Sequence, residues 1–87
     1  MSNLTIIKRI ESKLDEHLIG KINGDEFGKF LIDSIEAMEG LDYEKIQRAR
    51  DFQYKFEVSE FRESDPEIDS LEKVTADFKN WLTDLKK

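Results

Sequence analysis

Apolar residues recur at helical spacing along almost the whole chain, and this periodicity is the feature that most limits the fold. Ile7, Ile10, Leu14 and Leu18 return at steps of three and four residues, and later segments repeat the pattern. No segment alternates apolar and polar side chains as a half-buried strand does. We therefore expect an all-α protein, an antiparallel-type four-helix bundle forming a single domain over residues 1–87. The expected helices cover about residues 3–19, 24–39, 43–61 and 70–85.

Glycine and proline divide these helices from one another. Gly20 and Gly40 follow the first two apolar stripes, where a left-handed residue commonly ends a helix. Pro66 is the only proline in the chain, and it breaks the sequence before the last helix. Three breaks and four stripes predict four helices joined by short connections.

Side chains that cap helix N-termini precede three of the stripes. Asn23 with Glu26 matches the spacing of a capping box, and Asp42 stands before the third segment. Asp69 with Glu72 matches a second capping box, so Asp69 is the expected cap of the last helix.

Composition excludes several classes of protein. The chain has 87 residues and no cysteine, so it has no disulfide framework and no thiolate metal site. Its single histidine, His17, lies beside the first stripe, and a packing role is favoured over catalysis or zinc binding. No long apolar run is present, which leads us to expect a cytoplasmic protein without a membrane span or signal peptide. A pI near 4.8 argues against direct nucleic-acid binding.

The excess negative charge is concentrated in residues 57–72, which we call the acidic segment. It contains seven acidic residues and a single basic one, Arg62. The segment thus carries a net charge of −6, which equals the net charge of the whole chain. Such a concentration creates a directional field that attracts a basic partner. The alternative is that these acids are solvated loop residues and helix-start carboxylates.

Two short motifs suggest other chemistry but are incomplete. Asp69-Ser70-Leu71 matches the triplet at which acidic carrier proteins attach a phosphopantetheine arm, yet only 17 residues follow Ser70. Asn23-Gly24-Asp25 resembles part of a calcium loop but lacks the later oxygen ligands and the closing glutamate. Carboxylates on an open connection are solvated and therefore poorly suited to acid–base catalysis. We expect no enzyme activity, no cofactor and no metal.

The chain resembles the immunity proteins of the colicin D type, which protect bacteria against tRNA-cleaving bacteriocins and contact-dependent inhibition toxins. The resemblance lies in a G-x-I-x-x-x-x-F pattern from Gly20 to Phe27, preceded by an apolar helix. It continues in the aromatic-rich stretch 52–61, in Asp65-Pro66 and Ile68-Asp69, and in a leucine-rich last helix. It spans nearly the whole chain.

This resemblance implies a non-catalytic protein whose acidic side chains cover the basic tRNA-binding cleft of a toxin in a 1:1 complex. Lys55 departs from the family pattern, which can have an acid there. Tyr54 and Phe61 are candidate anchors within the acidic surface, although core packing is the favoured alternative for each. The expected toxin-binding residues are Glu57, Glu60, Glu63, Asp65, Glu67, Tyr54 and Phe61.

A second class of function uses the same charge. An acidic adaptor or nucleic-acid mimic would titrate a DNA- or RNA-binding regulator. A duplex mimic needs carboxylates spaced along an extended face, whereas this chain gathers them in one segment. An adaptor would in addition expose a larger apolar stripe for a partner helix. The pattern favours an inhibitor that fills a compact cleft.

Overall fold

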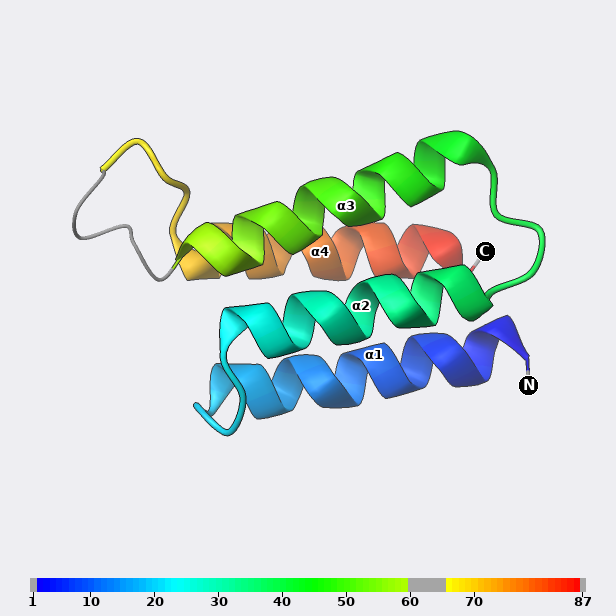
Figure 1. Ribbon diagram of the computed structural model, residues 1–87, viewed down its shortest axis with the longest axis horizontal. Coiled ribbons are helices and arrows are strands. Elements are labelled where there is room, and N and C mark those ends of the chain that lie inside the picture. The colour runs from blue at the N-terminus through cyan, green and yellow to red at the C-terminus, as the bar shows by residue number, and fades with distance from the viewer. Residues whose placement is uncertain (1, 60–65, 87) are drawn as a thin grey trace.

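The computed structural model describes residues 2–59 and 66–86, and these ranges contain four α-helices and no strand (Figure 1). Adjacent helices pack antiparallel, so the all-α, four-helix prediction is confirmed. The molecule measures 39 × 26 × 19 Å along its principal axes. The helices are α1 (Asn3–Leu18), α2 (Gly24–Ala37), α3 (Tyr43–Val58) and α4 (Leu71–Leu85).

The chain runs up and down, so the helix ends fall into two groups, one at each end of the bundle. Both chain termini lie at one end, and the α2–α3 connection is there too (Figure 1). The opposite end, which we call the distal end, contains the last turns of α1 and α3 and the first turns of α2 and α4. The acidic segment runs from the last turn of α3 to the first turn of α4, so its two flanks lie at the distal end.

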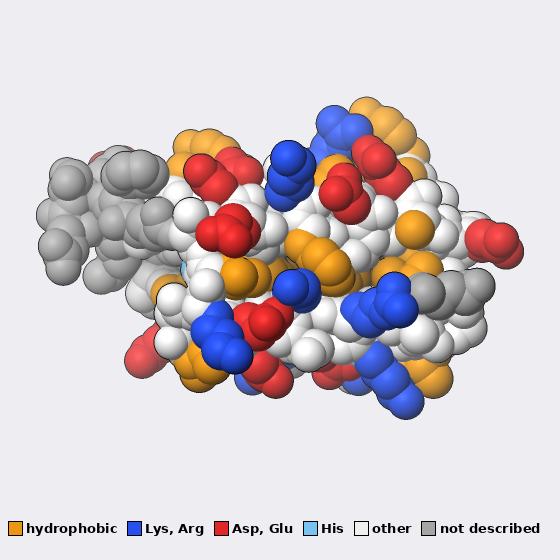
Figure 2. Space-filling view, turned by 60° about the horizontal axis from the view of Figure 1, so that its bottom comes forward, with side chains coloured by type: hydrophobic (Ala, Val, Ile, Leu, Met, Phe, Trp, Pro, Cys, Tyr) orange, Lys and Arg blue, Asp and Glu red, His pale blue; other side chains and the backbone are white. Residues whose placement is uncertain are grey.

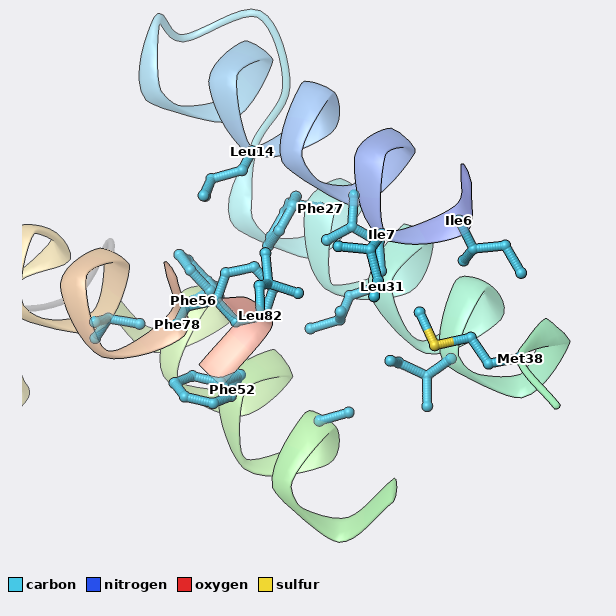
Figure 3. Close-up of a cluster of buried hydrophobic side chains, with 14 residues drawn as sticks. Ile6, Ile7, Leu14, Phe27, Leu31, Met38, Phe52, Phe56, Phe78 and Leu82 are labelled. Atoms are coloured by element: carbon cyan, nitrogen blue, oxygen red, sulfur yellow. The ribbon is translucent and has the colours of Figure 1, made fainter. Parts of the chain in front are cut away.

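The core is built around phenylalanine rings from three helices (Figure 3). The ring centroids of Phe27 and Phe56 are 4.8 Å apart, and those of Phe56 and Phe78 are 5.3 Å apart. Phe52 lies 5.1 Å from Phe78, and all these pairs meet edge to face. This geometry is favourable for aromatic quadrupoles and adds to the burial of apolar area. Aliphatic side chains of α1 and α2, among them Leu14 and Leu31, complete the core.

Helix starts follow the predicted caps except at α4. The Asn23 side chain accepts a hydrogen bond from the Glu26 amide at 2.8 Å, which confirms Asn23 as the cap of α2. Asp42 accepts from the amide of residue 45 at 3.0 Å and caps α3. The assignment of Asp69 as the cap of α4 is wrong. Ser70 occupies that position, and its hydroxyl accepts from the amide of residue 73 at 3.3 Å.

Gly20 ends α1 as predicted, because its φ of +84° lies in the left-handed region. The amide of Gly20 donates to the His17 carbonyl and that of Lys21 to the Glu16 carbonyl, the paired bonds of a Schellman motif. Gly40 does not play this role for α2. That helix ends at Ala37 with an extended cap residue, and Gly40 turns the following connection.

The predicted extension of the third helix to residue 61 lies partly outside the described residues. α3 ends at Val58, and Ser59 caps it.

Two glycines bring α2 and α3 into close contact. A Cβ atom on Gly24 would lie 2.5 Å from the backbone carbonyl oxygen of Phe56, which is shorter than van der Waals contact. A Cβ on Gly28 would lie 2.9 Å from Cγ of Gln53. The last turns of α3 therefore rest directly on the start of α2, and this contact fixes the position of the distal end of α3.

Candidate functional site: the distal end

Three of the seven predicted toxin-binding residues fall within the described structure. They are Tyr54 and Glu57 in the last turns of α3 and Glu67 in the connection to α4. The other four lie outside the described residues: Glu60, Phe61, Glu63 and Asp65.

Tyr54 lies on the surface. Its side chain is 65% exposed, although Phe52 and Phe56 on the same helix are buried. The alternative that Tyr54 packs in the core is therefore wrong. An exposed tyrosine has a large, rigid contact area and a polar hydroxyl, which suits it to an interface.

A groove separates the last turns of α3 from the chain that leads into α4. Its volume is about 300 Å³. Aromatic and aliphatic groups form part of its lining, and charged groups form the rest. We call it the α3–α4 groove, and its lining residues are Tyr54, Lys55, Val58, Glu67, Ile68 and Asp69.

Sequence reasoning did not identify the apolar part of this groove. Val58 and Ile68 are half-buried on its two sides. The signal for Ile68 was present, because it is an isolated aliphatic residue within an acidic connection. Its proximity to Val58 depends on how the chain returns from α3 to α4, which periodicity does not specify.

Glu57 belongs to a different surface from Glu67. The Glu57 carboxylate lies beside α2, with its Oε1 3.2 Å from the point that a Cβ on Gly28 would occupy. Its side chain is half-buried there, and it is not part of the groove lining. Of the predicted residues, the structure brings together Tyr54 and Glu67 and places Glu57 against the neighbouring helix.

His17 has the contacts of a packed residue. It is 8% exposed, and its ring stacks on Phe27 at 5.8 Å and meets Phe56 edge-on at 5.8 Å. Its Nδ1 is 3.0 Å from the carbonyl oxygen of Ile22. Because a carbonyl oxygen only accepts, Nδ1 carries the hydrogen and donates this bond. The bond ties the end of α1 to the turn before α2.

Ion pairs among the described residues lie mainly on the helix surfaces. Asp69, which does not cap α4, is 3.6 Å from Lys73 one turn later. Glu11 pairs with Lys86 at 3.0 Å and links α1 to the end of α4. Exposed pairs of this kind contribute little to stability, about 0.2–1 kcal/mol each.

Within residues 2–59 and 66–86, no three His, Asp or Glu side chains converge in a way that would hold a metal ion. None of the four described helices is long and apolar enough to cross a membrane. The chain matches no protein-family model, no characterised protein and no solved structure.

Proposed function

We propose that this protein binds and neutralises a basic bacterial toxin, a tRNA-cleaving nuclease, by covering its active-site cleft with an acidic surface. The observation that carries this proposal is the placement of the acidic segment. Its net charge of −6 equals that of the whole chain, and its two flanks lie at the distal end of the bundle. An acidic segment that leaves the bundle and returns to it at one end suits a protein that covers a cleft.

The physical basis is competition for the same cations. A nuclease that binds tRNA must present lysine and arginine side chains to the phosphates. Carboxylates that pair with these lysine and arginine side chains exclude the tRNA sterically and match the charge of its phosphates. Pairs between arginine and a carboxylate are frequently bidentate, and they are stronger than neutral hydrogen bonds. Inhibition by this route needs no catalytic group on the inhibitor, which binds the nuclease in a 1:1 complex.

The acidic adaptor or nucleic-acid mimic is the second candidate. A mimic of a duplex would carry rows of acids along its length. Figure 2 instead shows acidic and basic side chains interspersed over the described part of one long face. This mixture favours the cleft inhibitor over the duplex mimic.

Capture of the partner from the source cell, followed by an activity assay, tests the proposal. The captured protein is purified free of the inhibitor and incubated with tRNA. We expect it to cleave tRNA, and we expect an equimolar amount of this protein to stop the cleavage. A captured partner that binds DNA or RNA without cleaving it would contradict the proposal and support the adaptor.

A further inference from the structure

We propose that the α3–α4 groove is the docking pocket for one arginine side chain of the basic partner. This inference rests on the proposed function and names the chemical group that the groove receives. It is drawn from the shape of the groove, the kinds of side chain that line it and the charge around it.

The groove has the two kinds of surface that an arginine side chain requires. Tyr54 presents an exposed aromatic ring on the α3 side, and Val58 and Ile68 add aliphatic area. These groups suit the methylene stem of a long side chain and the flat face of a guanidinium. Glu67 and Asp69 contribute carboxylates to the same groove.

Two carboxylates and one lysine are among the lining residues of the groove, so this lining carries a net charge of −1. Lys55 is part of the lining, but its ammonium lies over the ring of Phe52, 5.7 Å from the centroid. Asp69 is paired with Lys73 at 3.6 Å, with the lysine side chain 64% exposed. A pair this exposed is weak, so an incoming guanidinium competes with it effectively. The surrounding acidic segment supplies the long-range attraction for a basic partner.

Arginine fits these features better than lysine or a small neutral molecule. A guanidinium is planar, stacks on an aromatic ring and presents a fork of donors to carboxylates, whereas an ammonium is a compact, strongly hydrated charge. The groove volume of about 300 Å³ is at the lower limit for small-molecule sites. One long side chain is an occupant of suitable size.

Titration of the full chain with short peptides, followed by amide NMR shifts, tests the pocket directly. The probe is acetyl-Gly-Arg-Gly-amide, and its two comparison peptides carry citrulline or lysine in place of arginine. Citrulline keeps the shape and removes the charge. We expect saturable shifts at the amides of Tyr54, Ile68 and Asp69 with the arginine peptide, and weaker binding of both comparison peptides.

Two tyrosines of α3 provide a matched pair of variants. Tyr54 lines the groove, while Tyr43, 74% exposed in the first turn of the same helix, does not. A stacked cation on an exposed ring contributes about 0.5–1 kcal/mol, so Tyr54→Ala should weaken the arginine peptide about two- to fivefold. Tyr43→Ala should leave its affinity unchanged.

The outcomes separate this inference from the proposed function. Non-saturating shifts, equal binding of the citrulline or lysine peptide, or equal effects of the two tyrosine variants would overturn the arginine pocket. The tRNA-cleavage assay tests inhibition independently. If Glu60→Lys with Glu63→Lys abolishes protection and Tyr54→Ala leaves the Kd for the arginine peptide unchanged, the pocket is wrong while the inhibitor function stands.

Discussion

At the scale of single residues, two glycines one turn apart in α2 have different structural roles. A methyl group on Gly24 would meet the backbone of Phe56 at 2.5 Å, and backbone atoms cannot move aside cheaply. A methyl on Gly28 would meet the flexible side chain of Gln53 at 2.9 Å.

We therefore predict that Gly24→Ala lowers the free energy of unfolding by about 1–3 kcal/mol, as expected for overpacking. Gly28→Ala should change it by less than about 1 kcal/mol, because the gain in helix propensity offsets the crowding. Urea unfolding followed by circular dichroism measures both. Equal losses would show that the close contact between α2 and α3 is wrongly placed at Gly24.

His17 illustrates a polar residue that serves the core. Its imidazole lies among aromatic rings and donates to the carbonyl of Ile22. We predict that His17→Leu, which keeps apolar bulk but removes the donor, lowers stability by about 1–3 kcal/mol. The folded variant should still protect tRNA from the captured nuclease. Loss of protection without loss of fold would assign His17 a direct role in binding.

At the scale of elements, the start of α4 distinguishes two neighbouring residues that both have capping side chains. Ser70 accepts the hydrogen bond from the first-turn amide, whereas Asp69 makes only an exposed pair with Lys73. Ser70→Ala should thus lower stability by about 1 kcal/mol. Asp69→Ala should lower it by less than about 0.5 kcal/mol, because it removes only the exposed pair with Lys73. Thermal unfolding compares the two, and a larger loss for Asp69→Ala would restore Asp69 as the cap.

The elements themselves were predictable because apolar residues recur at helical spacing over a long stretch in each of them. The errors lie where several residues satisfy the same local rule. Asp69 and Ser70 are adjacent and both cap helices well, and only the backbone angles of the folded chain decide between them. Gly40 is similarly plausible as a cap, yet α2 ends at Ala37.

The candidate site was less predictable than the helices. Residue charge and segment position follow from the sequence, so Glu67 was placed correctly in the α3–α4 connection. Which face a side chain takes on α3 did not follow, because that helix is apolar on more than one side. Tyr54 faces solvent and Glu57 packs beside α2 for reasons of tertiary packing. The α3–α4 groove likewise arises only when α3 and the chain before α4 come together.

At the scale of the whole molecule, up-and-down connectivity places the two described flanks of the acidic segment at one end of the bundle (Figure 1). Beneath these flanks, aromatic contacts reach from α2 through α3 to α4. In the proposed complex, we expect the charged end to orient the molecule as it approaches a basic cleft. Long-range attraction of this kind raises the association rate and weakens as salt increases.

The central claim is that the acidic segment carries the binding energy for a basic nuclease. Glu60→Lys with Glu63→Lys reverses two charges within the segment. Asp33→Lys with Glu36→Lys makes the same change at two exposed sites on α2. Glu11 is not used for this control, because its carboxylate forms an ion pair with Lys86.

Calorimetric titration of the two double variants against the captured nuclease measures this claim most directly. Loss of a desolvated charged pair weakens binding by about 2–5 kcal/mol, so the segment variant should show a Kd raised about 30-fold to several thousandfold. The α2 variant should bind within about threefold of the unmodified protein, because an exposed charge contributes little to affinity. Equal affinities for the two double variants would contradict the account.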